Sequence, residues 1–176
     1  MPDKHAVLSA SSSHRWLECP PSALLCSKAG DTASEFAMQG TDAHSLCEHK
    51  LKTALGQQSE DPTEDLQFFD EEMADCSDMY AQYVMEQLAA AKEKCKDPIV
   101  LIEQRLDFSK WVPQGFGTGD CVIVADETLT VIDFKYGVGI LVDAEKNPHM
   151  MCYALGALQL FDSIYDIDSV TMTIFQ

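Results

Sequence analysis

The sequence has few cations, no long apolar run and no apolar export signal. Its 176 residues include 12 Lys and Arg against 29 Asp and Glu, which gives a formal net charge of −17. Nine of the acids lie between Glu60 and Asp78, a stretch without Lys or Arg that we interpret as a solvated connection and a helix start. Phosphate contacts need cations, so this balance argues against tight, non-specific DNA binding by the whole surface, although it permits a local basic groove.

Two further absences concern membranes and export. No stretch approaches the roughly 18 to 20 apolar residues of a membrane span. Residues 1–13 contain no apolar signal core. We therefore predict a cytoplasmic protein without a membrane partner.

The seven cysteines are odd in number and form no Cys-x-x-Cys pair. In a chain without an export signal they are most simply reduced thiols, most of them buried. Cys19 and Cys26, with His14 nearby, fit no common zinc spacing, so we predict that both are ordinary core thiols.

The order of predicted elements indicates the fold class. Residues 1–97 are mainly helical, with a short helix around Trp16 and longer helices over about 42–55 and 66–94. Residues 98–176 contain the predicted strands and a nearly all-apolar helix; the strands cover 99–106, the segments around Asp120 and Asp133, and 169–175. This order predicts a mixed α/β fold in a single domain, with a small mixed sheet flanked by helices.

The most informative stretch runs from Gly117 to Gly137, GTGDCVIVADETLTVIDFKYG. It places Asp120 on one apolar strand, and Asp133 and Lys135 on the next. Strand periodicity puts Asp133 and Lys135 on one face, which Asp120 can reach if the two strands pair. Carboxylates in apolar strands need compensation, and hard oxygen ligands suit Mg²⁺ or Mn²⁺. A metal site assisted by a lysine is therefore predicted; the alternative is a surface ion pair on an edge strand.

Two other acidic or imidazole groups are candidates near this site. His44 and Glu48 lie four residues apart on a predicted helix and share a face, so His44 is either a third ligand or an ordinary surface or core histidine. Glu103 lies within an apolar strand, on the same face as Arg105. Glu103 is therefore a metal ligand, an acid that supports the ligands without binding the metal, or the ion-pair partner of Arg105.

His149 and Tyr153 lie four residues apart on the apolar helix that begins at Pro148. Polar groups on a buried face usually have a partner or a function. They are candidates for contact with a substrate phosphate or base; the alternative is a buried tyrosine satisfied by backbone groups.

Four segments in this order resemble the RecB-like branch of the PD-(D/E)XK nuclease superfamily: GTDAH, GTGD, VIDFK and HMMCY. The segment HAVLSASSSHRWLECPPS is similar to the opening of phage- and prophage-encoded exonuclease-like members. The resemblance covers about residues 5–153. It implies a restriction-endonuclease-like core with an additional N-terminal helical region.

The resemblance also implies residue roles. It makes His44, Asp120 and Asp133 ligands of Mg²⁺ or Mn²⁺, with the backbone carbonyl of Phe134 as a further ligand. Asp133 and Lys135 correspond to its D-x-K motif and Asp120 to a separate strand aspartate, and the resemblance makes all three catalytic. Behind these ligands, Glu48 and Glu103 are candidate supporting acids.

The family's Gln-x-x-x-Tyr motif falls on His149 and Tyr153, so a histidine replaces the usual glutamine in substrate binding. Some relatives hold an iron–sulfur cluster with one early Cys-Pro cysteine, which Cys19 matches, and three cysteines beyond the core. Because no three cysteines follow Tyr153, we expect no cluster here.

The end at Gln176, just after the last predicted strand, is what a fragment or a short member would show. A C-terminal DNA-binding surface would then be missing.

The predicted function is divalent-metal-dependent hydrolysis of DNA phosphodiester bonds, as an exonuclease in phage or prophage recombination or DNA processing. DNA is the expected partner, with a phage recombination or single-strand-binding protein as a further candidate. The alternative is a nuclease-fold module that binds DNA or a partner protein without cutting. The net charge and His149 favour the module, whereas the set of His44, Asp120, Asp133 and Lys135 favours the enzyme.

Overall fold

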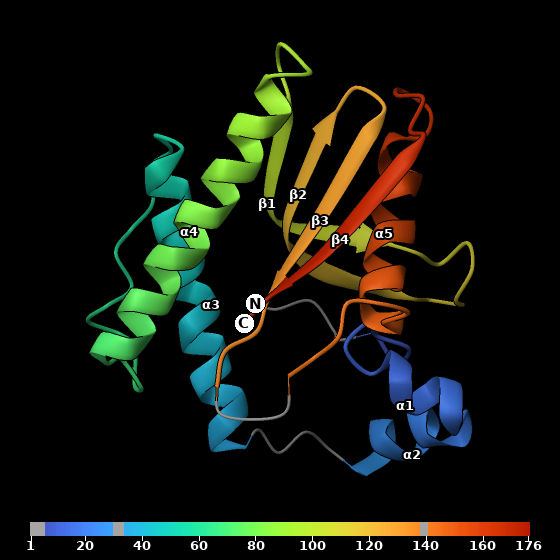
Figure 1. Ribbon diagram of the computed structural model, residues 1–176. Coiled ribbons are helices and arrows are strands. Elements are labelled where there is room, and N and C mark those ends of the chain that lie inside the picture. The colour runs from blue at the N-terminus through green and yellow to red at the C-terminus, as the bar shows by residue number, and fades with distance from the viewer. Residues whose placement is uncertain (1–5, 30–33, 138–140) are drawn as a thin grey trace.

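The computed structural model describes residues 6–29, 34–137 and 141–176 (Figure 1). His5, with which the resemblance begins, lies outside these ranges. The described elements are α1 (Ser13–Glu18), α2 (Pro21–Ala29), α3 (Glu35–Ala54), α4 (Glu71–Lys92), β1 (Ile99–Asp107), β2 (Phe116–Ala125), β3 (Thr128–Phe134), α5 (Pro148–Phe161) and β4 (Ser169–Phe175). This order confirms the predicted mixed α/β fold. Among the described helices, none is long and apolar enough to cross a membrane.

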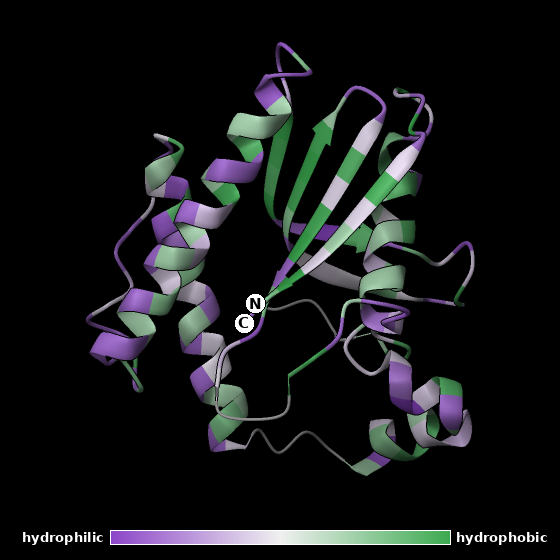
Figure 2. Cartoon of the chain, in the orientation of Figure 1, coloured by the Kyte–Doolittle hydropathy of each residue, from purple (hydrophilic) through white to green (hydrophobic). Residues whose placement is uncertain are grey.

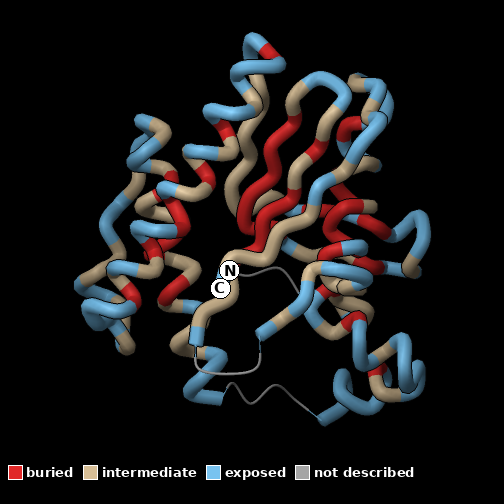
Figure 3. Tube along the Cα trace, viewed as in Figure 1, coloured by how far each residue is buried: buried red, intermediate tan, exposed pale blue. Residues whose placement is uncertain are grey.

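The four strands form one mixed sheet in the order β1-β2-β3-β4. β1, β2 and β3 are antiparallel neighbours, and β4 pairs parallel to β3 after the crossover through α5. In Figure 1, α5 lies on one side of the sheet, while α3 and α4 lie on the other. β2 and β3 are therefore the inner strands, and Figure 3 shows that they carry most of the buried positions of the sheet.

The two faces of the sheet have separate apolar cores, and alternate residues of β2 contribute to each. Val122 and Val124 pack with the helix α5, whereas Cys121 and Ile123 pack with α3 and α4. The part of β2 that pairs with β3 is accordingly continuously apolar in Figure 2. Burial on both faces explains why this stretch lacks the polar alternation of a one-sided sheet.

Helix α3 begins seven residues before the predicted start at position 42, which makes that prediction wrong at its N-terminal end. Ser34 caps the helix, because its side chain accepts a hydrogen bond from the Ala37 N–H. Gly40 lies inside the helix. A single interior glycine costs about 1 kcal/mol relative to alanine, which a capped helix of 20 residues tolerates.

Helix α4 begins later than predicted, at Glu71 instead of about residue 66. Asp70 is its N-cap and accepts a hydrogen bond from the Met73 N–H. The residues before it are held in a loop, because the Phe68 N–H donates to Asp42 Oδ2 of α3 at 2.8 Å. The apolar spacing alone did not reveal this tertiary contact.

The prediction that Cys19 and Cys26 are core thiols is wrong, because both are exposed. They belong to the small α1–α2 pair, which packs on α5 through α1 and leaves most of α2 in solvent. The broader expectation is confirmed: all seven cysteines are free, and four of them are buried, namely Cys47, Cys95, Cys121 and Cys152.

A bend in β1 and β2 reverses the alternation of side chains. Before it, Ile102 and Cys121 pair and face α3 and α4; beyond it, Leu106 and Gly119 face α5. The register continues unchanged, so Glu103 lies opposite Asp120 at the point of reversal. Glu103 has a φ of 49°, in the left-handed region that a non-glycine residue rarely occupies. Figure 1 shows both strands turning away from β3 and β4.

Gly156→Ala should destabilise the fold, because α5 crosses β1 closely at this glycine. An added Cβ would lie 2.8 Å from Leu106 Cβ and 3.1 Å from the Leu106 carbonyl carbon, and neither atom is the end of a flexible side chain. We expect a loss of about 1 to 3 kcal/mol in the free energy of unfolding, measured by urea denaturation. Gly40→Ala is the matched control: its Cβ meets nothing within 4 Å, so it should gain up to about 1 kcal/mol. Equal stability of Gly156→Ala and wild type would contradict the close crossing.

Candidate metal centre

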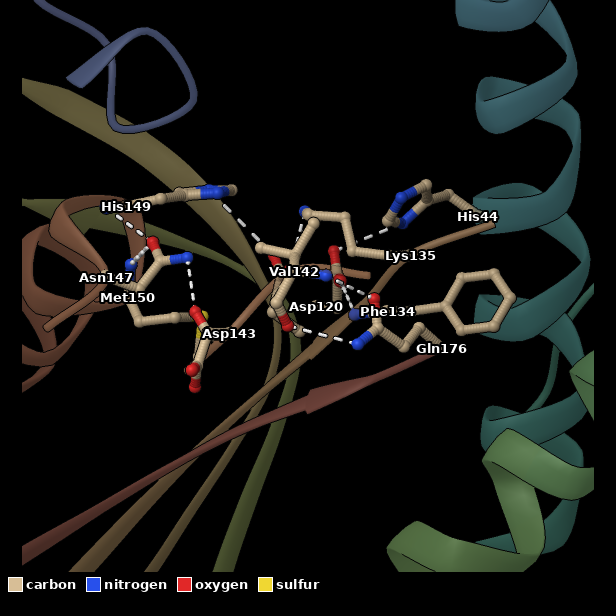
Figure 4. A network of polar contacts seen from close by, with 11 residues as sticks. His44, Asp120, Phe134, Lys135, Val142, Asp143, Asn147, His149, Met150 and Gln176 are labelled. Atoms are coloured by element: carbon tan, nitrogen blue, oxygen red, sulfur yellow. Dashed lines mark hydrogen bonds and ion pairs between the residues drawn. The ribbon is translucent and has the colours of Figure 1, made fainter. Parts of the chain in front are cut away.

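The candidate site lies where β2 separates from β3, a point that we call the fork. The last paired residues are Cys121 and Ile132, after which β3 continues only with β4. Asp120 closes this fork, because its Oδ2 accepts a hydrogen bond of 2.6 Å from the Phe134 N–H. Figure 4 shows Asp120 and Lys135 between His44 of α3 and His149 of α5. The fork thus leaves room for polar side chains between the two helices.

Three side chains from three elements come close enough to share one cation. One ligand atom from each of His44, Glu103 and Asp120 lies within 4.8 Å of the other two. His44 Nδ1 is 3.2 Å from Asp120 Oδ1. Asp120 is only 8% exposed, so its charge is poorly solvated without a partner. Two carboxylates and an imidazole form a donor set that fits Mg²⁺ or Mn²⁺.

Burial and charge within this group shift the pKa values of Glu103 and His44. Burial, with the added repulsion of Asp120, raises the pKa of Glu103 to about 7. Burial alone would lower the pKa of His44, but the hydrogen bond and charge of Asp120 outweigh it, so the pKa is raised. Protons therefore occupy these groups at a pH at which isolated carboxylates are ionised.

Asp133 lies beside this group and pairs with Lys135, with His149 nearby. Lys135 Nζ is 2.5 Å from Asp133 Oδ2, and His149 Nε2 is 3.8 Å from Asp133 Oδ1. Strand parity had predicted the shared face of Asp133 and Lys135. Asp133 is 2% exposed on an inner strand, so the alternative of a surface ion pair on an edge strand is wrong. Its assignment as a metal ligand stays a prediction.

Burial and nearby charge also shift the pKa values of Asp133 and His149. Burial raises the pKa of Asp133 to about 6, although Lys135 counteracts the rise. Burial, with the repulsion of Lys135, lowers the pKa of His149 to about 4. His149 is therefore neutral near pH 7. Its buried Nε2 has no hydrogen-bond partner among the described residues.

Tyr153 lies under His149, and two glycines of β2 make room for it. The two rings meet edge to face, with centroids 4.4 Å apart. A Cβ at Gly117 would lie 2.8 Å from Tyr153 Cε1, and one at Gly119 would lie 3.9 Å from Cδ2. A glycine inside a strand often marks such a close approach, so the GTG segment held a signal that we had not used.

The remaining predicted residues lie around the site without joining the three-residue group. Phe134 turns its ring away from the fork and packs against Tyr80 and Phe175, with the His44 ring at its edge. Its carbonyl as a ligand stays a prediction. Glu48 Oε1 pairs with Lys52 Nζ at 2.5 Å, one helical turn along α3. Glu48 therefore adds negative charge near Glu103 but is already neutralised by its own partner.

Fold and site together define a mixed α/β domain with a candidate metal centre in a fork of its sheet. The chain belongs to the family described as "Protein of unknown function (DUF2800)", whose model matches residues 5–176. No solved structure matches the chain. The family description names no activity, so the chemistry of the site has to carry the functional argument.

Metal affinity should rise with pH across the neutral range. Glu103, with its pKa of about 7, and His44 hold protons at lower pH, and a cation must displace them. The dissociation constant for Mn²⁺ should then fall by up to about tenfold per pH unit below pH 7 and level off above it. Calorimetric titration at several pH values checks this. In Glu103→Gln the affinity should be weaker and its pH dependence flatter; a slope as steep as that of wild type would exclude Glu103 from the site.

Proposed function

We propose that this protein is a divalent-metal-dependent nuclease that hydrolyses phosphodiester bonds in DNA. The observation that carries the proposal is the fork itself. There, His44, Glu103 and Asp120 converge beside the buried Asp133–Lys135 pair. Three carboxylates face one ammonium group, so the pocket has an excess of negative charge that one divalent cation would balance.

In this proposal His44, Glu103 and Asp120 hold Mg²⁺ or Mn²⁺, with Asp133 and the Phe134 carbonyl as further ligands. The bound ion would supply Lewis-acid chemistry, which polarises the phosphate and makes water more acidic. Lys135 has its ammonium fixed by Asp133 at 2.5 Å. A cation fixed in this way can orient the attacking water and stabilise the charge that develops on the phosphate.

The side of the site formed by α5, opposite α3, suits a phosphate. His149 is neutral near pH 7, and its Nε2 has no partner within the described part of the chain. The Nε2–H tautomer can donate one hydrogen bond to a phosphate oxygen, as the glutamine of the similar nucleases would. Tyr153 is 7% exposed and fixes the ring of His149 from below. The resemblance to RecB-like enzymes supports an exonuclease of phage or prophage origin.

A second candidate function rests on the net charge of −17, which opposes binding of a polyanion. In this alternative the same fold binds DNA or a protein without cutting.

One experiment separates the two functions. Purified protein is incubated with linear and circular duplexes and with single strands, in Mn²⁺, Mg²⁺ or EDTA. The nuclease should degrade linear DNA with either metal and not in EDTA, and Asp133→Asn should be inactive yet folded. End-labelled substrates give the polarity. Binding of DNA without cleavage under any metal condition would support the non-cutting module instead.

A further inference from the structure

The bend in β1 and β2 joins the candidate metal centre to an exposed strip of the hairpin. Beyond the bend, Leu106 and Gly119 face α5. Their neighbours Arg105 and Thr118 therefore face the opposite side, as do Glu103 and Asp120. Arg105 and Thr118 pair across the two strands and are exposed. A single surface thus runs from the metal centre towards the tip of the hairpin.

The hairpin carries two cation–aromatic pairs, one on its strands and one in the loop between them. The Arg105 guanidinium carbon lies 3.7 Å from the centroid of the Phe116 ring, and Lys110 Nζ lies 5.1 Å from the Trp111 ring. Trp111 is 44% exposed, although a large aromatic ring usually finds cover in a folded domain. We call Arg105, Lys110, Trp111, Phe116 and Thr118 the hairpin platform.

The platform differs in charge from most of the molecule. Residues 104–119 contain Arg105 and Lys110 against the single acid Asp107, whereas the whole chain has a net charge of −17. The nine acids between Glu60 and Asp78 belong to α4 and the loop before it, and α4 packs against α3. A polyanion is therefore repelled less at the hairpin than at this acidic stretch.

We propose that the hairpin platform binds a single-stranded nucleic-acid tail and leads it into the metal centre. This inference rests on the proposed nuclease function and names its substrate as a strand with unpaired bases. An exposed ring beside a cation is the arrangement on which bases stack, and stacking requires an unpaired base. The cations contact the phosphates between stacked bases.

The dimensions of the hairpin fit this path. Phe116 precedes Asp120 by four residues on one strand, which corresponds to about 13 Å at the usual rise per residue. Trp111 lies further along, in the loop between β1 and β2. A strand that reaches both Trp111 and the metal centre therefore spans several nucleotides, so short oligonucleotides should bind less tightly than longer ones.

The test measures binding without cleavage. A fluorescein-labelled oligo-dT is titrated with the protein in EDTA, and anisotropy gives the dissociation constant. Because Trp111→Ala removes one stacked base, it should weaken binding by about fivefold or more. Lys110→Gln should weaken it less and reduce the salt dependence by about one phosphate contact. A duplex of equal length should bind more weakly than the single strand.

Lys96→Gln is the matched control. Lys96 is also an exposed cation, but it precedes β1 at the opposite end of the sheet from Asp120, so its loss should leave binding unchanged.

A Trp16→Phe background isolates the fluorescence of Trp111, which the oligonucleotide should quench. Trp111→Leu repeats the test if the alanine variant is unstable. Equal affinity of Trp111→Ala and Lys96→Gln, or tighter binding of the duplex, would overturn the proposal. EDTA prevents cleavage, so this binding test does not depend on nuclease activity. If the nuclease proposal fails, the protein still binds the oligonucleotide through Trp111 but does not degrade DNA when metal is added.

Discussion

Lys135→Met should reduce metal-dependent DNA cleavage by about a hundredfold or more while the protein still binds Mn²⁺. Loss of one group that stabilises transition-state charge typically costs this much. Methionine keeps the length of the side chain and removes only the ammonium group that lies 2.5 Å from Asp133 Oδ2. Because the ammonium repels a nearby cation, Mn²⁺ should bind this variant at least as tightly as it binds wild type. Single-turnover cleavage and calorimetric titration measure the two effects.

Lys146→Met is the control for this experiment. The Lys146 side chain is 88% exposed and pairs only loosely with Glu145 at 3.6 Å, so its replacement changes the net charge equally without touching the fork. Its activity should match that of wild type. Asp133 in Lys135→Met loses its partner and takes up a proton more readily, so thermal melting is measured first to confirm that the variant is folded. Full activity in Lys135→Met would remove this lysine from the mechanism.

Mn²⁺ should raise the melting temperature of the wild type and have a clearly smaller effect on Asp120→Asn. Burial and the nearby charge of Asp120 raise the pKa of Glu103, and filling the site relieves the repulsion between the two carboxylates. Metal at a hundred times its dissociation constant adds about 2.7 kcal/mol, which for a domain of this size corresponds to roughly 5 to 10 °C. Asparagine keeps an oxygen for the Phe134 N–H, so the fork should stay closed.

The acidic stretch from Glu60 to Asp78 also attracts cations, and Asp75→Asn controls for this effect. Asp75 is an exposed acid of α4. Its replacement removes the same charge as Asp120→Asn, far from the fork, and should leave the Mn²⁺ shift intact. Equal shifts in wild type and Asp120→Asn would mean that the metal stabilises the protein through its acidic surface and that the fork is not the site being filled.

Local signals in the sequence predicted most elements correctly. Pro148 begins α5 and β4 covers 169–175, as expected. The starts of α3 and α4 were less predictable. Ser34 and Asp70 cap them, but a serine or aspartate is common enough outside helices that neither position stood out. The hydrogen bond from Phe68 to Asp42 joins residues 26 positions apart, which no local pattern reports.

The site shows the same division between local and distant information. Period-2 alternation predicted that Asp133 and Lys135 share a face, and they form an ion pair. The same alternation says nothing of a reversal, so the role of the bend in presenting Glu103 beside Asp120 and His44 was not predictable. Glu103 carried no residue-type signal for its φ of 49°, because glycine is the usual choice there.

The sequence by itself determined the fold class, the mixed sheet and the side chains that can carry metal chemistry, because burial patterns and residue types are local properties. Only the tertiary structure decided which of those side chains meet. The separation of β2 from β3, closed by Asp120 on the Phe134 N–H, brings a helix, an edge strand and an inner strand to one point. That convergence depends on backbone hydrogen bonds and helix packing between residues distant in the chain, and these contacts form only when the whole domain folds.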